Sequence, residues 1–395
     1  MGPPAPRAEA QRPSVRPVAA PALAARGFDA QAEELVAQIE PTAETDRVVQ
    51  GIVRLVADTV RRAVPEAEIT GVASGSLRGG TAFGVAVPEV DIVANISPAA
   101  LVQRLQMAAC GGEGPGQREA AAARFEARKL QKAATRLCTD RLVAHGSFKF
   151  RRSAFRAAEP KVTLLAPAAR GTAGEGVPFD FSVNCATPLY NAALLAECGQ
   201  MEPRARALIL LVRRWAKDRG VCHAAKGHLP PYAWTLLVIY FLQVGVAEEG
   251  PLLPPLRDFA LSSGLLAQDK EATKPPMKPR AVWVPAVGKG GGKSVGALFR
   301  DFVRFYGSEV DWRKEAAAVH LGRRASAGPT AELHVVVHES GAVEVAPTIQ
   351  DPFEPRRNVA ASATAAGLTR LREELARARA LCARGAELPE LLEPW

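Results

Sequence analysis

The chain has 395 residues, 48% of them hydrophobic and 23% charged, which excludes wholesale disorder and suits two domains with a cleft between them. Lysine and arginine number 50 against 41 acidic residues, so the net charge of +9 permits an anionic partner such as RNA without requiring one. The six cysteines show no zinc-site spacing, and the longest apolar run, residues 235–246, is too short to span a bilayer. We therefore expect no membrane association and an intracellular location, with cytoplasm or nucleus favoured and an organelle as the alternative.

The N-terminal half begins with a tail and continues into helices and strands. Residues 1–27 are rich in proline, alanine and arginine, which is typical of a disordered tail or a targeting segment. Apolar spacing predicts two helices over residues 28–63, broken near Pro41. From Glu68 the pattern changes to short strands that continue to Val93. The first domain is expected to span residues 28–184 and to carry catalysis.

The rest of the chain adds strands and then helices. We expect a loop at 111–116, a helix to about 137, a loop at 166–176, and strands at 142–143, 148–150, 162–165 and 177–183. Helical spacing dominates residues 185–395, which form the second domain, with an interruption rich in proline, glycine and lysine at 268–293 and a last helix at 368–384. The fold class is therefore α+β, a mixed sheet beside a helical domain, with a cleft between them.

Three carboxylates in apolar strand segments are the strongest chemical signal. Glu89 and Asp91 are two residues apart, so they project from the same face of a strand, and Asp180 lies in a later strand. Such acids repel unless a cation lies between them, and oxygen ligands suit Mg²⁺ or Mn²⁺. We predict that these three residues are catalytic and hold two Mg²⁺ or Mn²⁺ ions, with two surface acids at a strand edge as the alternative reading of Glu89 and Asp91.

A glycine-rich turn precedes the first two acids. Gly75 permits a tight turn, and Ser76 offers a hydroxyl beside backbone N–H groups, a combination that can face a phosphate. On its own this pattern is more often only a turn. Its place before the carboxylates favours nucleotide binding by Gly75 and Ser76.

Together with these acids, motifs in residues 201–204, 208–220, 231–243 and 349–354 resemble the noncanonical poly(A) polymerases and terminal uridylyltransferases. These belong to the DNA polymerase β-like nucleotidyltransferase superfamily and carry a poly(A)-polymerase-associated domain. The resemblance covers the chain from about Phe28 to its end. It implies a template-independent enzyme that adds AMP or UMP from the nucleoside triphosphate to an RNA 3′ end.

The resemblance also implies nucleotide contacts, carried over position by position. Asn191 matches a contact to ribose and base, although Ala192 replaces the threonine usual in relatives. Arg213 and Lys217 match two cations that hold the triphosphate; their spacing places both on one helical face, which would otherwise indicate a solvated surface. Tyr232 matches the aromatic side chain that stacks on the base.

Base selection is expected to depend on polar neighbours of that tyrosine. Asp351 is predicted to read a base amino group, and Arg357 stands where uridylyltransferases carry a histidine. This departure favours ATP, with UTP as the alternative, since arginine also donates to uracil carbonyls. No RNA-recognition module is evident, so a protein partner would supply any specific RNA target.

Two other functions remain open. Glu89, where most relatives carry aspartate, resembles the arrangement in cyclic GMP-AMP synthase and its relatives, so a synthase that joins nucleotides to each other is one alternative. An inactive RNA-binding scaffold is the other, although it would have no need of the three acids. Residues 288–294 resemble a phosphate-binding P-loop but lack its first glycine, because Val287 stands there.

Overall fold

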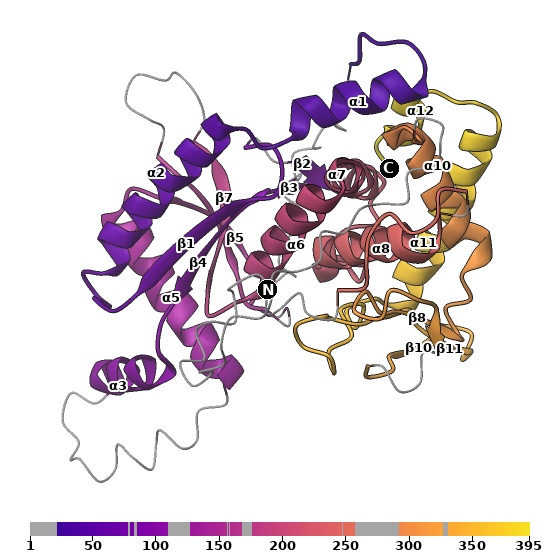
Figure 1. Ribbon diagram of the computed structural model, residues 1–395. Coiled ribbons are helices and arrows are strands. Elements are labelled where there is room, and N and C mark those ends of the chain that lie inside the picture. The colour runs from indigo at the N-terminus through magenta and orange to yellow at the C-terminus, as the bar shows by residue number, and fades with distance from the viewer. Residues whose placement is uncertain are drawn as a thin grey trace, which may run out of the picture.

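The computed structural model describes residues 22–77, 80–82, 85–109, 127–155, 157, 159–167, 176–246, 248–256, 292–326 and 331–395. A sheet with its helices occupies one side of the molecule, and a larger helical body occupies the other (Figure 1). Residues 1–21, the expected loop at 111–116, and residues 268–291 of the interruption lie outside the described ranges.

A five-stranded sheet in the order β1-β4-β7-β6-β5 forms the first unit. β4 and β7 are parallel, whereas every other neighbouring pair is antiparallel, so the sheet is mixed as expected. A separate hairpin joins β2 to β3. The strands are β1 (Glu68–Ala73), β2 (Gly80–Ala82), β3 (Val85–Val87), β4 (Val90–Asn95), β5 (Lys149–Ser153), β6 (Val162–Leu165) and β7 (Pro178–Val183).

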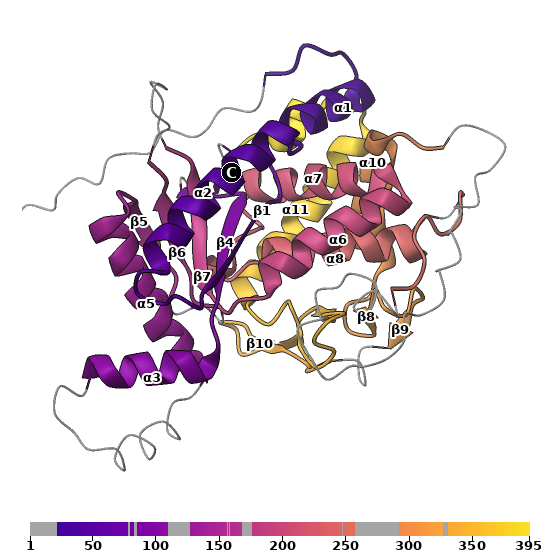
Figure 2. The same cartoon turned by 60° about the vertical axis from the view of Figure 1, so that its left-hand side comes forward.

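The two faces of the sheet differ in chemistry because side chains alternate along each strand. On one face, apolar residues such as Ile92 and Phe181 join the core formed with α2 (Ala43–Val60) and α5 (Ala127–His145). On the other face lie the polar side chains of the same strands, Asp91, Thr163 and Asp180 among them. Because α2 and α5 cover the apolar face, the polar face is on the side away from them, and in the rotated view the sheet lies between α5 and the helical body (Figure 2).

The helical body is built around the apolar helix α8, with Trp215, Trp234 and Phe302 in its core. α1 (Phe28–Ile39) precedes the sheet in sequence but packs on α7 and α10, so its apolar side belongs to this second core. Two separate apolar cores fit the division near residue 184 that we propose, with α1 crossing it. The helices are α6 (Thr187–Met201), α7 (Pro203–Asp218), α8 (Pro231–Val244), α10 (Val295–Arg304), α11 (Ala365–Ala383) and α12 (Leu388–Leu392).

Short elements complete the fold, and one sequence prediction was wrong. Residues 142–143 belong to α5 and not to a strand, because Leu142 continues the buried four-residue spacing of Ala134 and Cys138. The predicted helices broken near Pro41 and the last helix are confirmed. The remaining elements are α3 (Pro98–Ala109), η1 (Ala224–Lys226), η2 (Phe305–Glu309), β8 (Glu315–Ala317), β9 (Ala325–Ser326), β10 (Val335–Val337), β11 (Val343–Val345) and β12 (Thr348–Ile349).

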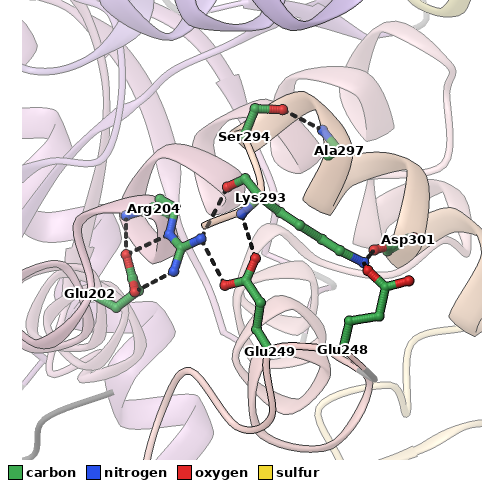
Figure 3. A network of polar contacts seen from close by, with 8 residues as sticks. All are labelled: Glu202, Arg204, Glu248, Glu249, Lys293, Ser294, Ala297 and Asp301. Carbon is green, nitrogen blue, oxygen red and sulfur yellow. Dashed lines mark hydrogen bonds and ion pairs between the residues drawn. The ribbon is translucent and has the colours of Figure 1, made fainter. Parts of the chain in front are cut away.

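A polar network fastens the start of α10 to the start of α7 (Figure 3). Arg204 pairs with Glu202 at 2.9 Å and with Glu249 at 3.1 Å, and it donates to the backbone oxygen of Lys293 at 3.0 Å. The ammonium group of Lys293 in turn pairs with Asp301 at 2.7 Å.

Within the described ranges, no helix combines the length and the apolar character needed to cross a bilayer.

Candidate functional site

Two of the three predicted carboxylates lie side by side. Asp91 on β4 and Asp180 on β7 are register partners in the parallel pair, so both side chains project from the polar face of the sheet. Asp180 is 4% exposed. Burial raises the pKa of Asp91 to about 6; the charge of Lys161 opposes this rise, and the charge of Asp180 adds to it. Two neighbouring buried carboxylates that repel each other favour the binding of a cation between them.

The described chain supplies two donors to Asp180, one from the neighbouring strand β6 and one from the residue just before it. Thr163, its antiparallel register partner, donates to Oδ1 at 2.5 Å, and the Lys161 ammonium lies 2.5 Å from Oδ2. Arg152 donates to the hydroxyl of Thr163 at 3.1 Å. The sequence analysis missed all three donors. Lys161 and Thr163 have the two-residue spacing of one strand face, but only the pairing of β6 with β7 shows which face that is.

The third carboxylate, Glu89, lies just before β4 and engages a different set of partners. Arg213 contacts Glu89 at 2.8 Å, Lys217 forms an ion pair with it, and Ser74 donates to it at 3.3 Å. Both cations are buried, with side chains 4% and 1% exposed respectively. Burial opposes ionisation of Glu89, but the charges of Lys217 and Arg213 prevail and lower the pKa of the carboxyl. Glu89 therefore faces the two cations expected to hold the triphosphate.

This arrangement bears on the predicted metal site. Within the described ranges, no group of three ligating side chains is gathered as it stands around a position for an ion. Asp91 and Asp180 nevertheless present neighbouring carboxylate oxygens, the donors that Mg²⁺ and Mn²⁺ favour. Glu89 could join them only by turning away from Arg213 and Lys217. The donor chemistry fits the predicted ions, and the assignment of Glu89 stays a prediction.

The turn at Gly75 and Ser76 lies against Glu89. A Cβ added at Gly75 would lie 3.0 Å from Cδ of Glu89, a tight contact, so the Glu89 side chain passes close over the backbone of this turn. A pocket of about 20 Å³ is lined by both turn residues, Glu89 and Arg213, and it has room for about one water molecule. Nε of Arg213 is buried without a partner among the described residues, which leaves a donor for an anion.

A second group of predicted residues meets at the other end of the site, where base contacts were expected. Tyr232, at the start of α8, donates its hydroxyl to Asp351 at 3.2 Å. Asp351 also accepts from the backbone of Phe353 at 2.9 Å, and its side chain is fully buried. Asn191 on α6 accepts from Thr235 at 2.7 Å. Tyr232, Asp351 and Asn191 are therefore held by contacts within the helical body.

Arg357 connects this group with the sheet unit. Its guanidinium contacts Thr187 at 2.7 Å, Glu159 at 2.8 Å and Asp351 at 3.3 Å. Glu159 lies between β5 and β6, so one of the three acceptors comes from the sheet unit. The sequence analysis did not single out Glu159, because nothing in its local pattern points to a residue almost two hundred positions away.

Comparison with known proteins gives partial sequence matches. No family model matches the chain. Similarity to the poly(A) RNA polymerase GLD2-A of Xenopus laevis is 29% identity over 155 residues, covering 38% of this chain and 28% of the relative. GLD2 of Danio rerio is 30% identical over 149 residues, which cover 38% of this chain and 29% of that protein. The terminal uridylyltransferase cid1 of Schizosaccharomyces pombe is 25% identical over 250 residues, 59% of this chain and 58% of that protein.

The matches therefore span less than a third of the GLD2 relatives. Structural similarity extends further. A solved structure of Cid1, described by its RNA terminal uridylyl transferase activity, superposes with a TM-score of 0.57 at 18% identity, covering 93% of this chain and 97% of that one. A structure of Cid1 bound to MgGTP superposes with a TM-score of 0.57 at 19% identity, covering 93% of this chain and 98% of that one. The homologues of this chain are GLD2 poly(A) RNA polymerases and the Cid1 terminal uridylyltransferase, and its α+β fold is the polymerase β-like nucleotidyltransferase fold of Cid1.

Proposed function

We propose that this protein is a template-independent RNA 3′-terminal nucleotidyltransferase that adds AMP, or alternatively UMP, from the nucleoside triphosphate. The observation that carries the proposal is the register pairing of Asp91 with Asp180 on the polar face of the sheet, where the charge of the buried Arg213 also acts on Asp91. Paired acids with a buried cation nearby suit a reaction that joins a metal-activated hydroxyl to a phosphate.

Each group has a role in this proposal. Asp91 and Asp180 would hold Mg²⁺ or Mn²⁺, with Glu89 joining them; such ions lower the pKa of a bound hydroxyl and stabilise a pyrophosphate leaving group. Asp180 would orient the RNA 3′-hydroxyl and accept its proton. Arg213 and Lys217 would bind the triphosphate, a role that fits their present contact with the carboxylate of Glu89.

The nucleobase would lie at the end defined by Asn191, Tyr232, Asp351 and Arg357. Because Tyr232 and Asp351 are buried, the base can reach them only if neighbouring side chains move. The substrates would be ATP or UTP and an RNA 3′ end, and an RNA-targeting protein would choose the RNA.

Product analysis tests the proposal directly. The chain is incubated with Mg²⁺ or Mn²⁺, a labelled RNA oligonucleotide and one NTP at a time, and the products are sized. We expect stepwise lengthening of the RNA, with ATP used better than UTP. Nucleotide dimers without RNA lengthening would favour the nucleotide-joining synthase, and RNA binding without any incorporation would favour the scaffold.

A further inference from the structure

A single acidic side chain crosses from the sheet unit to the base end of the site. Glu159 precedes the buried Pro160, and proline restricts the residue before it to extended conformations. The backbone N–H of Ala154 donates to the oxygen of Lys161 at 2.8 Å and closes this connection between β5 and β6. The side chain of Glu159 is 35% exposed, and it ends at Arg357 and Thr187.

The guanidinium of Arg357 is held from three directions. Asp351 follows β12, Thr187 begins α6, and Glu159 belongs to the sheet unit, so three segments distant in sequence supply the acceptors. Asp351 and Thr187 both belong to the helical body. Of the three acceptors that the described residues offer to Arg357, Glu159 alone belongs to the sheet unit, so it ties the orientation of Arg357 to the position of the sheet.

We propose that Glu159 is a positioning residue for Arg357 and thereby sets the choice of nucleobase. The inference rests on the proposed function, because it concerns which triphosphate that site accepts. Glu159 need not touch the base; it acts by fixing the hydrogen-bond donors that remain on Arg357.

The physical argument concerns rotational freedom. An arginine side chain has many rotamers, and its planar group discriminates between bases only when its donors are fixed in direction. The 2.8 Å contact with Glu159 engages one terminal nitrogen, and the contacts with Thr187 and Asp351 engage the other. Removing Glu159 frees one of the two terminal nitrogens, so the guanidinium can turn to suit either base.

The test compares ATP with UTP in single-nucleotide addition to a labelled RNA. For wild type, Glu159→Ala, Arg357→Ala and the double variant, kcat/KM is measured with each nucleotide. We expect Glu159→Ala, which removes the acceptor for one terminal nitrogen of Arg357, to move the ATP to UTP ratio towards one by about fivefold, within the range of coupling between contacting residues. The double variant should match Arg357→Ala, because Glu159 acts only through Arg357. A loss confined to folding would lower both kcat/KM values equally and leave the ratio unchanged.

Glu354→Ala is the matched control. The carboxylate of Glu354 lies 3.9 Å from the same guanidinium, beyond hydrogen-bonding distance, and its side chain is 52% exposed. The ATP to UTP ratio should stay at the wild-type value in this variant. An equal shift in Glu354→Ala and Glu159→Ala, an unchanged ratio in Glu159→Ala, or a wild type that uses both nucleotides equally would each overturn the inference.

A binding measurement separates this inference from the proposed function. ATP and UTP compete for a fluorescent nucleotide on the same four proteins in the presence of Ca²⁺, and the ratio of their dissociation constants should follow the same pattern. A chain that binds nucleotides selectively but never lengthens RNA would overturn the proposed function and leave the role of Glu159 supported. A chain that binds neither nucleotide would overturn both.

Discussion

The two ends of the site are built in different ways. At the carboxylate end, Asp91 and Asp180 come from adjacent strands, and backbone pairing alone brings them together. At the base end, Arg357 meets the nearby Asp351 and also Glu159 and Thr187, which come from segments distant in sequence. The first end therefore depends on local sheet geometry, whereas the second depends on how the two units pack. Variants at the carboxylate end should have the larger effects on catalysis, and variants at the base end should change selectivity.

The largest expected effect is at Asp180. Asp180→Asn should lower nucleotide addition on the order of a thousandfold, because it removes a charge that the ion and the attacking hydroxyl both require. The amide keeps the volume of the carboxylate, so the circular dichroism spectrum should stay unchanged. Asp140→Asn, on the exposed side of α5, is the control and should keep wild-type turnover. Near-wild-type activity in a folded Asp180→Asn variant would remove this residue from the reaction.

The next effect concerns stability at the cation pair. Glu89→Gln leaves Arg213 and Lys217 buried without the carboxylate that pairs with both, and we expect a loss of about 3 kcal/mol in the free energy of urea unfolding. Adding Lys217→Met should recover part of that loss, since one of the two uncompensated cations is then removed. In contrast, Arg47→Met breaks an exposed pair and should change stability little. If the double variant were as unstable as Glu89→Gln, the loss would come from packing and not from charge.

A pH-dependent effect should appear at Asp91. The raised pKa means that the folded protein binds this proton more tightly than the unfolded chain does, so its stabilising contribution is complete below pH 3.8 and is lost as the pH rises through about 6. Asparagine does not titrate, so the Asp91→Asn variant does not undergo this loss of stability. Without divalent ions, the variant should be more stable than wild type at pH 8, on the order of 1 to 3 kcal/mol, and this gain should vanish near pH 4. Urea unfolding at both pH values measures it; a gain independent of pH would contradict the assignment.

The smallest expected effect on activity is that of the conservative change Glu89→Asp. Glu89→Asp shortens the side chain by one methylene, so we expect about a tenfold loss of activity with Mg²⁺ and a smaller loss with Mn²⁺, which tolerates less regular coordination. Glu89→Ala should be inactive. Full turnover in Glu89→Ala would show that another acid completes the site and that Glu89 serves only Arg213 and Lys217.

The sequence predicted those features that depend on short repeats. The two-residue spacing within β4, the apolar strands around Asp180 and the buried helix α8 each follow from a local period, so the fold class and the pair Asp91 and Asp180 could be predicted. Motif order along the chain added the helical body and the helix that carries Arg213 and Lys217, whereas their binding of a triphosphate stays a prediction.

The features that could not be predicted depend on tertiary packing. Lys161 and Thr163 contact Asp180 because β6 lies beside β7. The order of strands in a sheet cannot be inferred from residue spacing within one strand. Leu142 illustrates the other failure, because a short apolar run suits a helix as well as a strand. Glu159 became recognisable only when its contact with Arg357 was seen.

The contact of Glu89 with Arg213 and Lys217 has a consequence for how ligands would cooperate. A triphosphate that takes over the two cations releases the carboxylate, and a released carboxylate can bind an ion. Each ligand would then raise the affinity of the other by the same factor, as thermodynamic reciprocity requires. The affinity for the ion would thus depend on whether a nucleotide is bound, and an ion alone would bind weakly. The longer side chain of glutamate, compared with aspartate, would allow Glu89 to move between the two cations and the ion.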